Sequence, residues 1–215
     1  MMNKTGIRWY TYKKEESMLS EKPWRKEFDD LLEKMKAFWG GQITSFDDTD
    51  IPAEKTLSSL YVYPIYKATV DGFPLQVTIS EFPLPGGGLI TAADNVEFLS
   101  ILLIAPCAFK AAIRHEHLMD RIKKKLGLEY EAQTGNEKFD EKYFLITALK
   151  EDVSILKSDQ VQQHIMDLEP FDGLHFSKGG INFTHSIFDK NMLKVQNVEV
   201  IAKRLVTLAN LVQQK

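Results

Sequence analysis

Apolar residues recur every three or four positions in three parts of the chain, at 20–41, 158–169 and 197–215. This spacing predicts amphipathic helices, each turning one face toward the protein interior. The pair Gly40-Gly41 is a stop signal for the first helix. The inward-facing residues are expected to be Trp24, Phe28, Leu31, Leu32, Met35 and Phe38 in the first helix, Val161, Ile165 and Leu168 in the second, and Val198, Ile201, Ala202, Leu205, Leu208, Ala209 and Val212 in the third.

Two hairpins are predicted from runs in which aromatic or β-branched residues alternate with polar ones. The runs at 59–70 and 73–82 are separated by Asp71-Gly72, a dipeptide typical of tight hairpin turns. The second hairpin is expected over 173–188, around a turn at 178–180.

Further strands are predicted at 96–106, 108–117 and 142–149, and a short helix at 118–128. The run at 96–106 is apolar on both faces, which favours a central position in the sheet. The polar and acidic stretch at 42–56 is interpreted as a loop.

Hairpin signals dominate the chain, and repeated βαβ units are missing from the pattern. This order is typical of an α+β fold with a mostly antiparallel sheet. We expect an N-terminal helix, short internal helices and a C-terminal helix packed on that sheet, in a single domain over 1–215. The basic and aromatic residues of 1–19 are interpreted as an extended arm lying on the sheet.

Composition excludes several classes of function. The chain has 27 basic and 30 acidic residues and a net charge of -3, so no nucleic-acid binding is expected. Cys107 is the only cysteine, which rules out an intramolecular disulfide and a zinc site of the four-cysteine kind. We expect Cys107 to be buried. The longest uncharged apolar run, 98–109, is too short to cross a bilayer, and a cytoplasmic location is expected.

Three residues are the candidates for catalysis: His115, His117 and Asp140. The two histidines are two positions apart, so on a strand they would share a face and could bind one metal ion with a third ligand. The HExxH motif is absent, and the pair is also typical of a polar strand end, so no metal and no cofactor is expected. His175 and His185 lie on the two arms of the second hairpin, where a structural cross-strand pair could form.

Asp140 lies in the segment from Thr134 to Ile146, which combines a turn with the entry to a strand. Gly135 permits a positive φ in the turn. Phe139 and Phe144 would anchor the two sides, and the Asp140 carboxylate could accept backbone hydrogen bonds that hold the turn. This structural role is favoured over a role as an acid.

The same segment resembles a family of bacterial domains that contain a Gly-Asp-x-x-Phe-Asp-x-x-Phe stretch. The matching positions are Gly135, Asn136, Phe139, Asp140 and Tyr143-Phe144, followed downstream by Leu156. Asn136 stands where the family has Asp. The resemblance implies a shared fold unit, and no catalytic residue is inherited from it.

The sequence therefore predicts a non-catalytic binding or assembly domain, because motifs for catalysis or cofactors are missing while aromatic residues are plentiful. The expected partner is another protein or a second copy of the chain. The alternative is a small hydrolase-like enzyme that uses His, Asp and Glu side chains. A weaker hypothesis is membrane-surface contact through the N-terminal segment.

Overall fold

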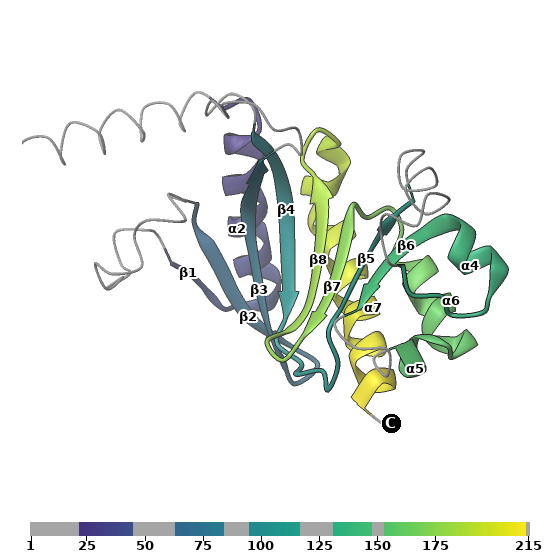
Figure 1. Ribbon diagram of the computed structural model, residues 1–215. Coiled ribbons are helices and arrows are strands. Elements are labelled where there is room, and N and C mark those ends of the chain that lie inside the picture. The colour runs from purple at the N-terminus through teal and green to yellow at the C-terminus, as the bar shows by residue number, and fades with distance from the viewer. Residues whose placement is uncertain (1–21, 45–62, 84–94, 117–130, 148–152, 214–215) are drawn as a thin grey trace, which may run out of the picture.

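The computed structural model describes residues 22–44, 63–83, 95–116, 131–147 and 153–213, and these form an α+β fold with an eight-stranded antiparallel sheet (Figure 1). The predicted fold class is confirmed. The strands are β1 (Gln42–Thr44), β2 (Ile65–Val70), β3 (Phe73–Pro83), β4 (Asn95–Leu103), β5 (Ala111–His115), β6 (Tyr143–Thr147), β7 (Gly173–Ser177) and β8 (Gly180–Ser186). The helices are α2 (Arg25–Trp39), α4 (Glu137–Lys142), α5 (Val153–Leu156), α6 (Asp159–Asp167), the 3-10 helix η5 (Lys190–Leu193) and α7 (Val195–Gln213).

The strands lie in the order β1-β2-β3-β4-β8-β7-β5-β6. The first four form a meander, and the hairpin of β7 and β8 is inserted between β4 and β5. β4 is therefore central, as predicted from its apolar run. Both hairpins are confirmed: Asp71 and Gly72 have positive φ in the turn between β2 and β3, and Ser177 pairs with Gly180 in the second hairpin.

Helices α2 and α7 cover one face of the sheet, and α4, α5 and α6 gather near the edge formed by β5 and β6 (Figure 1). Among the described residues, no helix covers the other face, which is turned toward the viewer in Figure 1. We call this second face the open face. In β4, Leu99, Ile101 and Leu103 point into the core, whereas Phe98 and Leu102 on the open face are only partly buried.

The expected helix stripes are buried, with one exception. Phe38 is 58% exposed, because it lies in the last turn of α2 and helical spacing gives only the direction of a side chain. Some segments also differ from the prediction. Residues 42–44 of the expected loop form β1, and 137–142 form the short helix α4. The short helices α5 and η5 lie where no helix was predicted.

Cys107 is buried as expected, and burial raises the pKa of its thiol to about 11. None of the described helices has the length and apolar character that crossing a membrane would require. The arm predicted at 1–19, the helix at 118–128 and the catalytic candidate His117 lie outside the described residues.

Candidate functional site

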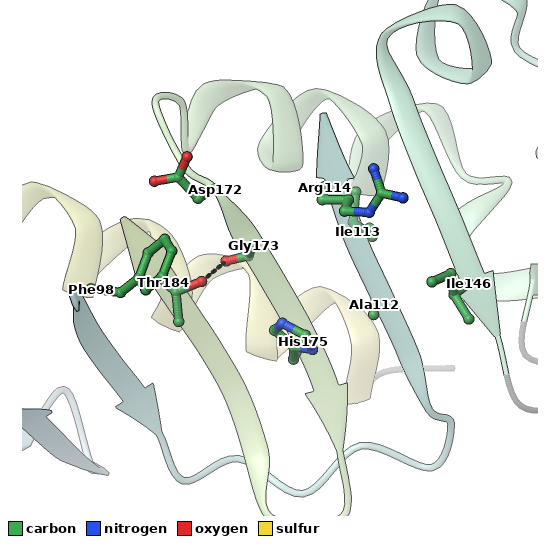
Figure 2. A pocket seen from close by; sticks show the side chains of 9 residues that line it. All are labelled: Phe98, Ala112, Ile113, Arg114, Ile146, Asp172, Gly173, His175 and Thr184. Atoms are coloured by element: carbon green, nitrogen blue, oxygen red, sulfur yellow. Dashed lines mark hydrogen bonds between the residues drawn. The ribbon is translucent and has the colours of Figure 1, made fainter. Parts of the chain in front are cut away.

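A hollow of about 470 Å³ lies on the open face, across strands β4, β8, β7, β5 and β6 (Figure 2). Its walls combine apolar and polar side chains. The lining residues are Phe98, Ala112, Ile113, Arg114, Ile146, Asp172, Gly173, His175 and Thr184.

Small residues on neighbouring strands make the floor of this hollow. On β7, Gly173 pairs with Thr184 of β8, and two positions further His175 pairs with Asn182. On β5, Ala112 pairs with His175 on one side and with Ile146 on the other. Because alternate residues of a strand share a face, these side chains all belong to the open face. Larger neighbours rise around Gly173 and Ala112, and the surface is hollowed between them.

Arg114 forms the wall toward β6. Its guanidinium lies over the ring of Phe144, 4.4 Å from the ring centroid, and its Nη1 donates to the carbonyl of His115 at 3.2 Å. Figure 2 shows the Arg114 side chain directed toward β6, away from Gly173. Stacking on an aromatic ring is a contact that suits a guanidinium. The Arg114 side chain therefore does not cover Gly173.

His175 and Thr184 flank the floor at Gly173. A Cβ atom at Gly173 would lie 2.8 Å from the Thr184 hydroxyl oxygen and 3.1 Å from the His175 Nε2. The Thr184 hydroxyl donates to the carbonyl of Gly173 at 3.2 Å. Partial desolvation against the sheet lowers the pKa of His175 below its ordinary value, which favours the neutral imidazole at pH 7.

Asp172 stands at the rim of the hollow. Its Oδ2 accepts the backbone N–H of Ser186 at 2.6 Å and lies 3.2 Å from Nδ1 of His185. The contact with His185 and the bond from Ser186 outweigh burial and lower the pKa of Asp172. His185 lies on the opposite side of the sheet from His175, whose partner across the hairpin is Asn182. The predicted pairing of the two histidines is therefore wrong.

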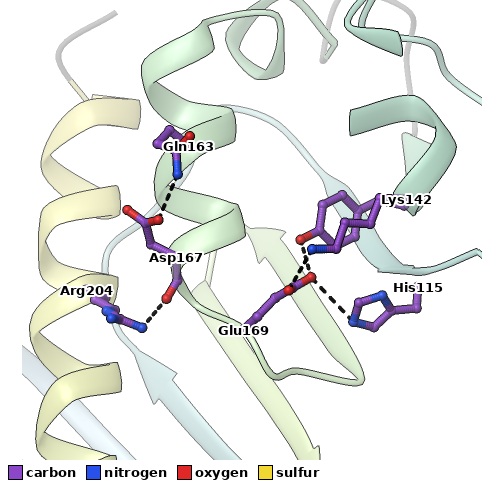
Figure 3. Close-up of polar contacts among 7 residues, drawn as sticks. His115, Lys142, Gln163, Asp167, Glu169 and Arg204 are labelled. Atoms are coloured by element: carbon purple, nitrogen blue, oxygen red, sulfur yellow. Dashed lines mark hydrogen bonds and ion pairs between the residues drawn. The ribbon is translucent and has the colours of Figure 1, made fainter. Parts of the chain in front are cut away.

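A second polar cluster surrounds Glu169, in the connection between α6 and β7 (Figure 3). Its carboxylate accepts hydrogen bonds from Lys142 Nζ at 2.7 Å and from the Tyr143 hydroxyl at 2.5 Å. Nε2 of His115 lies 3.7 Å from the same carboxylate. The imidazole of His115 also stacks on the ring of Phe171, with centroids 5.6 Å apart.

The partners of Glu169 determine its charge. Burial acts to raise the pKa of Glu169, but the hydrogen bonds from Lys142 and Tyr143 and the charge of Lys142 outweigh it, and the pKa is lowered. Burial, together with the bond to Glu169 and its negative charge, raises the pKa of Tyr143. The cluster therefore holds an ionised carboxylate beside a protonated phenol. Such a phenol is a hydrogen-bond donor and a poor nucleophile.

Asp140 does not belong to the hollow or to the Glu169 cluster. One carboxylate oxygen accepts from the backbone N–H and the hydroxyl of Thr134, and the other accepts from the backbone N–H of Gly135. Gly135 has the positive φ expected for it, at 90°. Asn136 caps α4 by accepting from the N–H of Phe139. Asp140 therefore holds the turn that leads into α4.

The structure places His115 beside Glu169 and Asp140 beside Thr134, in separate groups of contacts. Within the described ranges, no three His, Cys, Asp or Glu side chains gather in a way that could hold a metal ion. His117 lies outside those ranges.

Sequence reasoning missed Gly173, Thr184 and Glu169. Gly173 opens the predicted second hairpin, and a glycine inside a strand is a signal of close approach by another group. Glu169 is followed by Pro170. A proline after a helix indicates only that the chain turns there, so no sequence signal marked a polar cluster at Glu169. Gln162 of α6 was missed as well: it is 1% exposed, its Oε1 accepts from the Asn136 side chain, and its Nε2 donates to the carbonyl of Leu156.

Comparison of the chain with models of protein families, with curated proteins and with solved structures found no match. The resemblance of the segment from Gly135 to Phe144 therefore stays a prediction.

Proposed function

We propose that this protein is a binding domain that takes a small organic molecule into the hollow on the open face. The observation that carries the proposal is the hollow itself. Its volume of about 470 Å³ falls in the range of roughly 300–1,000 Å³ that is usual for small-molecule sites. Such sites combine an apolar lining with a few polar groups that orient the ligand.

The residues that line the hollow support a small-molecule site. Phe98 and Ile146 supply apolar surface from β4 and β6, at opposite ends of the hollow. His175 and Thr184 supply polar atoms between them, and Arg114 supplies a positive charge at the wall. Ile146 is 46% exposed, so it adds little to the core of the free protein and is available to a ligand.

The hydrolase-like alternative draws its support from the pair of His115 and Glu169, because a carboxylate beside an imidazole can orient a general base. Two observations favour the binding domain. The Glu169 carboxylate already accepts from Lys142 and Tyr143, and the hydroxyl of Tyr143 has a raised pKa, which opposes its use as a nucleophile.

The proposal is tested with 1-anilinonaphthalene-8-sulfonate, whose fluorescence rises when it enters an apolar site. The full chain should bind the dye saturably, at one molecule per chain. Ile146→Ser should weaken binding about fivefold or more, because it removes apolar contact from the wall of the hollow.

Phe38→Ser is the matched control, because Phe38 is also exposed but lies on α2, away from the open face. It should leave the dissociation constant within about twofold of the wild-type value. Circular dichroism would establish that both variants are folded. Equal dye binding by the two variants, or no saturable binding by the wild type, would refute the proposal.

A further inference from the structure

We propose that two copies of this chain pair through their open faces across a two-fold axis. Phe188 of each copy then packs on Ile146 of the other, and Asp172 of each copy faces Arg114 of the other. This inference goes beyond the proposed binding function, because the contacts that carry it join two protein surfaces and need no ligand.

Phe188 is an apolar side chain that stands out from the surface. It is 82% exposed, more than any other large hydrophobic residue in the described ranges. Its backbone N–H donates to Ser186 Oγ, and the next residue, Asp189, caps η5 by accepting from the N–H of Asn191. The ring therefore stands on an ordered turn. Exposed aromatic residues of this kind are enriched at protein interfaces.

Phe188 lies at the Asp172 end of the open face. It follows Ser186, the last residue of β8, by two positions. Ser186 pairs with Phe98 of β4, which lines the hollow, and its N–H donates to Asp172. Ile187 is 2% exposed and belongs to the core, so the next side chain, Phe188, turns away from the core.

Ile146 lies at the opposite end of the hollow, on β6, the last strand of the sheet (Figure 2). It is 46% exposed. Apolar surface in water is unfavourable, and it is removed when two such faces meet with the end of one on the opposite end of the other.

The two charged side chains that line the hollow have the same arrangement. Asp172 precedes β7, on the side of Phe188, and Arg114 lies on β5, on the side of Ile146 (Figure 2). The pKa of Asp172 is lowered by His185 and by the bond from Ser186, so the carboxylate is ionised at pH 7. A face with opposite charges at its two ends is complementary to a copy of itself turned through a half rotation.

The strand order gives both pairs the same centre. β8, β7, β5 and β6 are consecutive in the sheet. Phe188 and Ile146 belong to the outer two of these strands, and Asp172 and Arg114 belong to the inner two. A two-fold axis between β7 and β5 therefore brings together the apolar pair and the charged pair in one operation.

The size of the contact sets the expected affinity. Four neighbouring strands about 4.8 Å apart make a contact only about 20 Å wide. This lies at the small end of the range for specific interfaces, so we expect a micromolar dissociation constant. Sedimentation equilibrium of the full chain at about 1 to 200 µM should show a monomer and a dimer in exchange.

Phe188→Ser should weaken the dimer about tenfold or more, because both rings lose their apolar contact. The change is at an exposed position, so the variant should fold as the wild type does. Phe38→Ser is the matched control. Phe38 is also an exposed phenylalanine, but it lies on α2, which covers the other face of the sheet, and this variant should keep the wild-type dissociation constant.

A charge exchange tests the second pair. Asp172→Arg and Arg114→Asp each place like charges opposite one another, so each variant alone should stay monomeric where the wild type is a dimer. An equimolar mixture of the two variants should dimerise again, because the charges across the mixed interface are opposite. A structural effect inside one chain cannot produce this recovery. If either charge variant fails to fold by circular dichroism, Phe188→Ser decides the question.

The inference is wrong if the wild type is monomeric at about 200 µM, if Phe188→Ser dimerises as the wild type does, or if the mixture of folded charge variants stays monomeric. Dye binding is a separate measurement. A monomer that binds the dye saturably leaves the binding domain standing and removes the dimer. A dimer that depends on Phe188 but binds no dye has the reverse meaning.

Discussion

Both hydrogen-bond donors of Thr134 point at one carboxylate oxygen of Asp140, the backbone N–H at 3.0 Å and the hydroxyl at 2.8 Å. The second carboxylate oxygen accepts the N–H of Gly135 at 2.9 Å. Asp140 is only 9% exposed, so these bonds are largely shielded from water. The carboxylate thereby joins helix α4 to the turn that precedes it.

Replacement of Asp140 by Asn should destabilise the protein by about 1–3 kcal/mol. An amide offers one acceptor oxygen, so its NH₂ group would face either Thr134 or Gly135 and leave a donor unsatisfied. Urea denaturation at pH 7 measures the effect. Glu137→Gln, an exposed change in the same helix, should stay near the wild-type stability. Equal midpoints for the two variants would contradict the role given to Asp140.

Glu169→Gln should lower the free energy of unfolding at pH 7 by about 1–2 kcal/mol, because the charge that pairs with Lys142 is lost. The pKa of Glu169 is lowered in the folded protein, so the stability from its ionised form is complete above its ordinary pKa of 4.5. That stability is lost as the pH falls through the lower folded-state pKa. The wild type and the variant should therefore converge in acid.

Denaturation at several pH values between 3 and 7 would record this convergence. Glu199→Gln is the control, since Glu199 forms a surface ion pair with Lys203 on α7, and its profile should follow that of the wild type. A constant gap between the wild type and Glu169→Gln down to pH 3 would show that Glu169 does not contribute through its charge.

Gly40 and Gly41 give a matched pair for testing the close approach of the α2–β1 connection to β2. Both have positive φ, at 70° and 83°, but only Gly41 faces another strand. A Cβ at Gly41 would lie 2.3 Å from the carbonyl oxygen of Lys67, whereas nothing lies within 4 Å of a Cβ at Gly40. Gly40→Ala should cost about 1–3 kcal/mol through backbone strain.

Gly41→Ala should cost about 2 kcal/mol more than Gly40→Ala, because the added methyl displaces the backbone of β2. Thermal unfolding followed by circular dichroism would compare the two variants directly. Similar Tm values for both would mean that β1 and β2 can separate without cost at this point.

The helices and hairpins were predictable because their signals are local. The apolar stripe of α7 and the turn at Asp71-Gly72 depend on neighbours within a few residues, and both were found as predicted. Helix α4 was missed, although the sequence analysis placed a turn at Gly135, just before it. A six-residue helix has too few positions for helical spacing to be recognised.

The role of Asp140 was also within reach of the sequence, since its hydrogen bonds go to residues five and six positions earlier. The position of His175, in contrast, could not be inferred from neighbouring residues. Its predicted partner His185 lies on the other side of the sheet, because the hairpin pairs Ser177 with Gly180 and so sets His175 against Asn182. The register of a hairpin decides which face every side chain occupies.

The sequence by itself determined the fold class, the two hairpins and the buried faces of the long helices, because periodic apolar spacing is a property of each segment alone. Only the tertiary structure determined which residues come together in the candidate site. Gly173, Ala112 and Ile146 come from three strands, and they line one hollow because the β7-β8 hairpin is inserted between β4 and β5. That strand order depends on packing between distant segments, which no local pattern in the chain records.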